Sequence, residues 1–500
     1  MLGSVSPLDA DVDVCYRALA ARDARFDGLF FVGVETTGVY CRPVCPARTP
    51  GRDRCRFFRA ATQAEAAGFR SCFRCRPELA PGAAPVDALS RVVASAMRRI
   101  DEGALSPDGS VDGLARELGV SGRHLRRAMQ AELGVSPLAL AETRRLALAR
   151  QLIVDTTLPM TEVAFASGYR SVRRFNAAVK ARYARSPSTM RRGGRAPAGT
   201  GTGTGAGAND DTLTVMLPYR APYDWAAMLG HLAARAIPGV EHVRDGVYLR
   251  TAGFGACRGW LAVAADGGRA ALRATISTSL SGSLMTVVAR LRRLFDLDAQ
   301  PAAIAAHLSR DPRLAAHVRA RPGLRVAGAF DPFEAAARAV LGQQVSLAAA
   351  RTIAGRLVVA GGAPIATPHP ELTHVFPSAA DISRQPDVGF AASLGVPARR
   401  AATLLAFARA IASGRLAFDA ALEPASLIEQ IIALPGVGPW TAHYLAMRAV
   451  GWPDAFPEGD LVLRKRLGGI SGRAARALAE PWRPWRAYGA THLWQGGAQP

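Results

Sequence analysis

Four cysteines near the N-terminus form two close pairs. Three residues separate Cys41 from Cys45, two separate Cys72 from Cys75, and 26 residues lie between the pairs. Two such pairs can bring four thiolates around one ion, and an all-sulfur tetrahedral site suits Zn²⁺. The spacing therefore predicts a zinc centre, which either only folds a small module or also carries out chemistry.

A second set of residues whose types and spacing could carry out chemistry lies near the C-terminus. Residues 434–442 read Leu-Pro-Gly-Val-Gly-Pro-Trp-Thr-Ala between two stretches of helical spacing, and Asp460 follows Gly438 by 22 residues. Gly436 and Gly438 let backbone amides approach a DNA phosphate at a helix N-terminus. We expect a helix-hairpin-helix motif and a carboxylate that caps the helix starting at Leu461, acts in catalysis, or does both.

The elements that position these residues fall into four domains. The chain has 500 residues, and residues 193–208 read GGRAPAGTGTGTGAGA, a composition typical of a flexible linker. Alternating apolar residues at 212–217, 247–251, 260–265 and 270–277 predict an antiparallel sheet, and spacing from about Phe333 onward is helical. We place the boundaries at 1–80 (zinc module), 84–192 (helix-turn-helix domain), 193–210 (linker), 211–325 (α+β domain) and 326–500 (helix-hairpin-helix domain).

The charge of the chain predicts a polyanionic partner. The net charge is +22, only two of the basic residues are lysines, and both sides of the linker are basic, at +12 for residues 1–195 and +10 for the remainder. This balance favours nucleic acid. Mean hydropathy of +0.08 argues against a disordered chain. With no long apolar stretch, no leader pattern and seven cysteines, we expect a cytoplasmic protein associated with the nucleoid.

A helix-turn-helix pattern occurs twice. Ala115-x3-Gly119 and Ala164-x3-Gly168 are related by a shift of 49 residues, with a small residue at the helix crossing and glycine in the turn. The alternative is an ordinary helical bundle. Ser121 and Ser171 would cap the second helix of each copy. The predicted groove-reading residues on these helices are Arg123, His124, Arg126 and Arg127 in the first copy and Arg170, Arg173, Arg174 and Asn176 in the second.

The text around the cysteines resembles a known family. FVGVETTGVYCRPVCPAR and FRAATQAEAAGFRSCFRCRPE are similar to the N-terminal domain of the Ada methylation-response proteins, and KARYARSPSTMRR resembles the end of AraC-type DNA-binding domains. The resemblance implies that Cys41 accepts a methyl group from a DNA phosphotriester, once per chain. Because zinc keeps the thiol deprotonated, this chemistry is reasonable. Nine arginines would contact phosphates: 42, 48, 52, 54, 56, 59, 70, 74 and 76.

Three cysteines lie outside the ligand set, namely Cys15, Cys55 and Cys257. Ada-type proteins often continue into a methyltransferase domain with a Pro-Cys-His-Arg motif. Here Cys257, in the context GACRGW, is the only cysteine after Cys75. We therefore expect no repair of O6-methylguanine by that route.

The C-terminal half resembles the AlkA-type 3-methyladenine DNA glycosylases of the helix-hairpin-helix superfamily. Besides the hairpin and Asp460, the similar segments are PYDWAAMLGHLAARAIPGVEHV, ARLRRLFDLDA, FDPFEAAARAVLGQQVS and PWRPWRAYGATHLW. The resemblance implies a pocket of Trp440, Tyr444 and Trp494 for a flipped base, with Asp460 stabilising the sugar cation. An electron-rich indole would favour a cationic base.

Three positions refine that prediction. Trp440 stands where bifunctional relatives carry a Schiff-base lysine, so we expect a glycosylase without strand cleavage. Gln344 stands where some relatives carry an apolar wedge that fills the vacated base stack, and Gln343 beside it would contact the minor groove or cap a helix. Leu461 stands where some relatives have a pocket tyrosine.

These observations predict a mainly α multidomain protein with α+β parts: a small zinc-bound α/β module, an all-α tandem helix-turn-helix domain, an antiparallel-sheet α+β domain and an all-α helix-hairpin-helix glycosylase domain. The function would join methyl acceptance with transcription activation and excision of 3-methyladenine. Expected partners are Zn²⁺, double-stranded DNA and RNA polymerase, with the chain a monomer away from membranes. Two alternatives remain: a zinc-dependent regulator whose C-terminal domain only binds DNA, and a metal sensor. Methylation would change the site charge from about −2 to about −1 and so raise promoter affinity.

Overall fold

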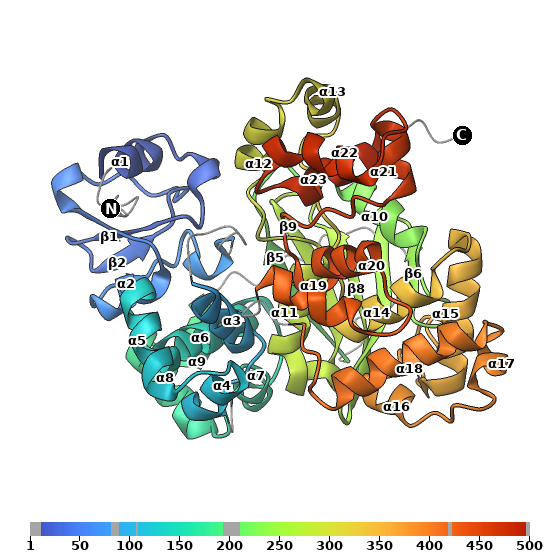
Figure 1. Cartoon of the computed structure of the whole chain (residues 1–500). Coiled ribbons are helices and arrows are strands. Elements are labelled where there is room, and N and C mark those ends of the chain that lie inside the picture. The colour runs from blue at the N-terminus through green and yellow to red at the C-terminus, as the bar shows by residue number, and fades with distance from the viewer. Residues whose placement is uncertain (1–11, 82–89, 107–108, 194–210, 419–422, 497–500) are drawn as a thin grey trace.

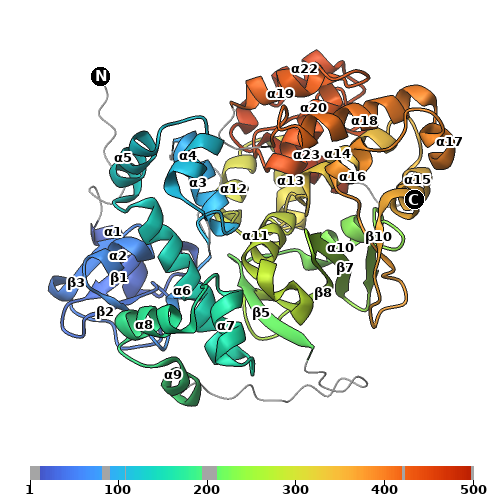
Figure 2. The same ribbon diagram turned by 90° about the horizontal axis from the view of Figure 1, so that it is seen from below.

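The computed structural model describes residues 12–81, 90–106, 109–193, 211–418 and 423–496. Figures 1 and 2 show two bodies side by side, an N-terminal half in blue to teal and a C-terminal half in green to red. The predicted linker lies outside the described residues, apart from Gly193 at the end of helix α9. Among the described helices, none is both long and apolar enough to span a membrane.

The zinc module is a four-stranded sheet with two helices. The strand order is β3-β1-β2-β4, with β1 antiparallel to its two neighbours and β2 parallel to β4. Tyr40 pairs with Ser71 in that parallel register, so the next residues, Cys41 at the end of β2 and Cys72 just after β4, lie side by side. The elements are α1 (Val12–Ala20), η1 (Ala24–Phe26), β1 (Phe31–Val34), β2 (Val39–Cys41), η2 (Arg52–Arg54), β3 (Cys55–Phe58), α2 (Ala61–Ala66), β4 (Arg70–Ser71) and η3 (Pro77–Leu79).

The helix-turn-helix region has two similar helix pairs joined by one long helix, α6. Gly119 and Gly168 adopt φ of +69° and +85° in the two turns, and Ala115 and Ala164 are fully buried at the helix crossings, which confirms the predicted pattern. The helices are α3 (Arg91–Asp101), α4 (Val111–Glu117), α5 (Gly122–Leu133), α6 (Pro137–Asp155), α7 (Met160–Ala166), α8 (Val172–Tyr183) and α9 (Pro187–Gly193). With 19 residues, α6 spans about 28 Å, close to one turn of DNA.

The C-terminal half begins with a five-stranded antiparallel sheet in the order β5-β9-β8-β7-β6. The sequence pattern predicted four of these strands and missed β6, a short edge strand with only one buried residue. The elements are β5 (Thr212–Pro218), α10 (Trp225–Ala233), β6 (Glu241–Arg244), β7 (Val247–Phe254), β8 (Cys257–Ala265), β9 (Ala271–Ser277), η4 (Thr278–Ser283), α11 (Leu284–Leu294), α12 (Pro301–Leu308) and α13 (Pro312–Ala320).

The remaining elements are helical except for a short two-stranded ribbon, β10 (Ala363–Pro364) and β11 (His374–Val375), which the periodicity did not predict. The helices are α14 (Pro332–Leu341), α15 (Leu347–Gly361), α16 (Ala379–Ser383), α17 (Phe390–Leu394), α18 (Ala398–Ala412), α19 (Pro424–Ile432), α20 (Pro439–Leu445), the π-helix η5 (Ala446–Val450), α21 (Leu461–Arg466), α22 (Gly472–Leu478), η6 (Glu480–Trp482) and α23 (Arg486–Gln495).

The two halves pack against each other. One cluster of buried apolar side chains runs from α6, α7 and α8 into β5, β8, β9 and α11. Polar contacts accompany it: Arg293 pairs with Glu102, Thr286 Oγ1 donates to the Glu102 carbonyl at 2.8 Å, and Arg220 Nε donates to the Asp27 carbonyl at 3.1 Å. The linker therefore joins two bodies that share a core.

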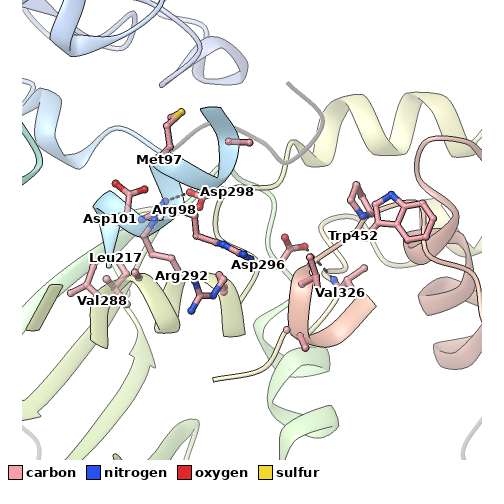
Figure 3. A pocket seen from close by; sticks show the side chains of 18 of the residues that line it. Met97, Arg98, Asp101, Leu217, Val288, Arg292, Asp296, Asp298, Val326 and Trp452 are labelled. Carbon is pink, nitrogen blue, oxygen red and sulfur yellow. Dashed lines mark hydrogen bonds and ion pairs between the residues drawn. The ribbon is translucent and has the colours of Figure 1, made fainter. Parts of the chain in front are cut away.

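A cavity of about 620 Å³ lies at this junction, between α3 and α6 on one side and α11 and η5 on the other (Figure 3). Its charged lining is largely paired within the protein. Arg292 pairs with Asp298, Arg144 lies 2.8 Å from Asp101, and Tyr488 Oη donates to Asp296 at 2.8 Å. Each of these contacts lies within one half, and together they leave few charges in the cavity for a ligand.

Candidate functional site

The four predicted cysteine ligands meet in one buried cluster. The sulfur atoms of Cys41, Cys45, Cys72 and Cys75 all lie within 4.8 Å of one another, and each residue is less than a tenth exposed. A tetrahedron with Zn–S bonds of about 2.3 Å has edges of about 3.8 Å, so the donor set fits Zn²⁺. Cys55 stays outside the cluster, with its sulfur 3.3 Å from the Gly51 carbonyl oxygen.

Hydrogen bonds distinguish the four sulfurs. The backbone N–H of Arg42 donates to Cys75 Sγ and that of Arg74 donates to Cys72 Sγ, both at 3.4 Å. Among the described residues, no backbone N–H bonds to Cys41 Sγ. Because N–H donors withdraw charge from a metal-bound thiolate, Cys41 keeps more nucleophilic character than Cys72 or Cys75.

Two of the nine arginines predicted to contact phosphates have a different role. The Arg42 guanidinium forms an ion pair with Asp27 and donates to the Cys75 carbonyl at 3.2 Å. Arg76 makes two bonds of 2.7 Å to Asp155 on α6. The guanidinium N–H groups of both arginines donate to nearby carboxylates, so these two side chains stabilise the module and do not face DNA. The other seven are exposed, although Arg52 pairs with Asp13 and Arg54 with Asp53. They are Arg48, Arg52, Arg54, Arg56, Arg59, Arg70 and Arg74.

The zinc module is joined to the helix-turn-helix region through α6. Arg150, which is 1% exposed, donates to Ser71 Oγ at 2.6 Å and to the Cys72 carbonyl at 3.0 Å, and lies 3.1 Å from Glu78. A side chain of α6 thus bonds directly to the backbone of a zinc ligand.

The predicted groove-reading side chains are all exposed. Ser121 caps α5 by accepting from His124 N, and Ser171 caps α8 by accepting from Arg174 N, as predicted. The exposed residues are Arg123, His124, Arg126 and Arg127 on α5, Arg173, Arg174 and Asn176 on α8, and Arg170 before it. Arg126 lies 3.4 Å from Asp112, and the remaining side chains extend the basic face.

The hairpin lies between α19 and α20. Gly436 adopts φ +78°, and a Cβ there would lie 2.3 Å from Thr403 Oγ1, so glycine is required. Gly438 begins α20, and a Cβ there would meet nothing within 4 Å. Gln343 Nε2 lies 3.3 Å from the Gly436 carbonyl oxygen, which makes Gln343 a brace for the hairpin. Its neighbour Gln344 is exposed, with φ +55°.

The aromatic residues converge on Asp460. Trp440 Nε1 donates to Asp460 Oδ2 at 3.0 Å, and Trp494 Nε1 donates to Oδ1 at 3.0 Å. Oδ1 also accepts from Leu463 N at 2.9 Å, so Asp460 caps α21 as predicted. Tyr444 stacks on Trp440 with the ring centroids 5.2 Å apart at 14°. Leu461 is exposed beside the carboxylate.

Sequence reasoning missed Arg448 in the π-helix η5. Its guanidinium carbon lies 5.4 Å from the Tyr444 ring centroid and 5.6 Å from that of Trp494, and Nη1 donates to the Ala327 carbonyl at 2.6 Å. Burial alone would raise the pKa of the Tyr444 phenol, but the positive charges of Arg448, Arg235 and Arg338 outweigh it and lower that pKa. The spacing of Trp440, Tyr444 and Arg448 by four residues each could have indicated this column.

Two histidines near the site are held neutral. Burial, reinforced by Arg476 and Arg486, lowers the pKa of His443 to about 4. Burial likewise lowers the pKa of His492, on α23, to about 4. Neither imidazole therefore acts as an acid at neutral pH, and the ionisable side chains that contact the pocket aromatics are Asp460 and Arg448.

A helix-hairpin-helix fold with a carboxylate between aromatic side chains is typical of a DNA glycosylase, here joined to a four-thiolate zinc module and a tandem helix-turn-helix. Family models agree: the metal binding domain of Ada matches residues 14–78, a helix-turn-helix domain matches 114–193 and the AlkA N-terminal domain matches 214–331. The chain is 45% identical over 488 residues to the probable bifunctional transcriptional activator/DNA repair enzyme AlkA of Mycobacterium tuberculosis, covering 97% of this chain and 96% of that protein. It belongs to this family of bifunctional activator and repair proteins.

Two further comparisons concern the C-terminal half. DNA-3-methyladenine glycosylase 2 of Escherichia coli is 35% identical over 278 residues, covering 56% of this chain and 95% of that protein. The solved 3-methyladenine DNA-glycosylase of Archaeoglobus fulgidus aligns with a TM-score of 0.50 at 18% identity, covering 56% of this chain and 97% of that one. The second likeness concerns the fold alone.

Proposed function

We propose that this alkylation-damage response protein excises 3-methyladenine and related alkylated purines with Asp460 as its catalytic carboxylate, and accepts methyl groups from DNA methylphosphotriesters at Cys41. The observation that carries the glycosylase assignment is the position of Asp460, whose two oxygens accept from the indole N–H groups of Trp440 and Trp494. These bonds fix the carboxylate where a flipped nucleotide between the aromatic side chains would place its sugar.

The reaction follows from that arrangement. The C1′–N bond breaks and its electron pair goes to the alkylated base, which loses its positive charge and leaves as a neutral molecule. Asp460 stabilises the cationic sugar and accepts the proton of the water that bonds to C1′. Because Trp440 occupies the position of a Schiff-base lysine, the product is an abasic site in an intact strand.

Methyl transfer at Cys41 needs no proton. The thiolate attacks the methyl carbon of the phosphotriester, an S–C bond forms, the C–O bond breaks, and the phosphate oxygen keeps the electron pair. Zinc, when bound by the four cysteines, supplies a thiolate at neutral pH. Supporting Cys41 as the acceptor, backbone N–H groups donate to the sulfurs of Cys72 and Cys75, while none of those in the described ranges donates to Cys41. The thioether product does not hydrolyse, so each chain reacts once.

DNA binding by the N-terminal half would couple this reaction to transcription. The basic faces of α5 and α8 would enter successive major grooves, since α6 separates the two helix pairs by about one DNA turn. Exchange of a thiolate for a thioether removes one negative charge beside seven exposed arginines, which raises affinity for the promoter. The proposal has three further parts: the chain binds RNA polymerase, it is a monomer, and it is located in the cytoplasm.

The glycosylase assignment is tested with Asp460→Asn. We expect release of 3-methyladenine from alkylated DNA to fall by at least 10²-fold while DNA affinity stays within about threefold. Glu458→Gln is the matched control, because Glu458 lies in the same loop and its carboxylate is 3.6 Å from Arg476, away from the indole N–H groups that bond to Asp460. If Asp460→Asn releases base at the wild-type rate, the C-terminal half only binds DNA.

The acceptor assignment is tested by mass spectrometry after exposure to DNA that carries methylphosphotriesters. We expect one added methyl group on the peptide with Cys41. Cys55→Ser should react like the wild type, because Cys55 lies outside the cluster. A methyl group on another cysteine would assign the acceptor role to that residue in place of Cys41. An unmodified chain would favour the metal-sensor alternative.

A further inference from the structure

Arg448 is a buried cation without a counter-charge. It is 6% exposed, and in the described part of the chain no carboxylate pairs with it. Two other buried arginines have carboxylate partners, with Arg250 2.8 Å from Glu334 and Arg486 2.7 Å from Asp454. Arg325, which is 3% exposed, resembles Arg448 in donating to backbone carbonyls. A buried charge is normally paired, and Arg448 differs from Arg325 because its guanidinium contacts two of the proposed pocket rings, Tyr444 and Trp494.

The surroundings of Arg448 place this charge behind the base pocket. Trp440, Tyr444 and Arg448 follow one another at four-residue intervals, so Tyr444 lies between the Trp440 ring and the guanidinium. The π-helix η5 begins directly after α20 and carries Arg448 to within 5.6 Å of the Trp494 ring centroid as well. Two of the three proposed pocket rings thus already contact a permanent cation.

A permanent cation alters what such a pocket favours. Rings that contact one cation attract a second cation less, so a positively charged base binds less well than the aromatic side chains alone would allow. In the transition state the base loses its positive charge, or gains negative charge if it was neutral. A fixed positive charge behind the base stabilises that change relative to the bound substrate.

We propose that Arg448 is a positioning residue that sets the specificity of base excision by weakening the binding of cationic purines and promoting departure of the base. It acts through Tyr444 and Trp494 rather than by contact with the sugar. Asp460 would then stabilise the cationic sugar with its negative charge, and Arg448 would stabilise the departing base with its positive charge. This inference rests on the proposed assignment of the pocket.

Arg448→Met tests the inference in single-turnover excision with two duplexes, one carrying 7-methylguanine, a cationic base, and one carrying hypoxanthine, a neutral base. For 7-methylguanine we expect the half-saturating enzyme concentration to fall and the maximal rate also to fall, each by on the order of tenfold. For hypoxanthine we expect only the rate to fall. Arg448→Lys keeps the charge and should keep the wild-type balance between the two duplexes.

A purely structural role predicts a different pattern, in which Arg448→Met weakens binding of both duplexes and lowers both rates together. That pattern, or unchanged constants for 7-methylguanine, would overturn the inference. The half-saturating concentration for 7-methylguanine suffices for the decision even if hypoxanthine is released slowly. If the wild-type chain releases neither base, 3-methyladenine takes the place of 7-methylguanine as the cationic base, and if that base is not released either, the proposed function fails instead.

Discussion

The ion pair between Glu102 and Arg293 is the most direct probe of the contact between the two halves. Glu102 follows α3, Arg293 lies on α11, and their side chains are 19% and 24% exposed. Glu102 also lies 3.8 Å from Arg99. Glu102→Arg therefore replaces attraction to two guanidinium groups with repulsion from both, while Arg293→Glu in the same chain restores an opposite pair.

The size of the effect follows from the partial burial of the pair. Two unit charges about 4 Å apart interact by about 4 kcal/mol at an effective dielectric of about 20, and partial exposure reduces this to about 1–3 kcal/mol. Burial alone would raise the pKa of Glu102, but Arg293 outweighs it and lowers that pKa below its ordinary value of 4.5. The stabilisation is therefore fully present above about pH 4.5 and is lost as the pH falls through the lowered pKa.

Calorimetry of the full chain measures this contact. Because one apolar core runs through both halves, we expect a single main unfolding transition for the wild type at pH 7. Glu102→Arg should lower the transition by roughly 2–6 °C or split it in two, and the double variant should recover at least half of the shift. If the single variant melts like the wild type, or the double variant melts lower still, the halves do not rely on this pair.

Further predictions concern the hairpin, α6 and the metal. Gly436→Ala should lower the free energy of unfolding by about 1–3 kcal/mol, because its Cβ would lie 2.3 Å from Thr403 Oγ1. Gly438→Ala should unfold like the wild type and lose only DNA affinity, so equal melting of the two variants would refute this reasoning. Arg150→Met should weaken zinc retention in competition with a chelator, because Arg150 bonds to the Cys72 carbonyl; retention equal to the wild type would exclude that role. Complete removal of zinc should unfold the acceptor module and abolish methyl uptake, while base excision persists; loss of excision would mean that the module supports the distant pocket.

Sequence reasoning was most effective where the signal is local. The two cysteine pairs, the glycines at 119 and 168, and the serine caps at 121 and 171 depend on neighbours within a few residues, and the structure has them as predicted. The alternating strands were found for the same reason. The edge strand β6 was missed because one buried residue gives no alternation.

The remaining features depend on pairings between distant residues. Nothing near Arg42 in the sequence indicates that Asp27 would pair with it, and a basic residue beside a DNA-binding site is more simply interpreted as a phosphate contact. The buried position of Arg448 depends on Ala327, 121 residues away. The contact between the halves was likewise hidden, because a flexible linker is compatible with both independent and packed domains.

The shared core ties the lifetimes of the two activities together. A chain whose acceptor cysteine carries a methyl group cannot regenerate it, so the signal ends only when the chain is degraded. Because α6, α7 and α8 pack into the same core as β5, β8 and β9, unfolding the spent half exposes apolar surface of the other half. Degradation of a methylated chain would therefore also remove its glycosylase half, so that excision capacity would fall together with the methylated activator.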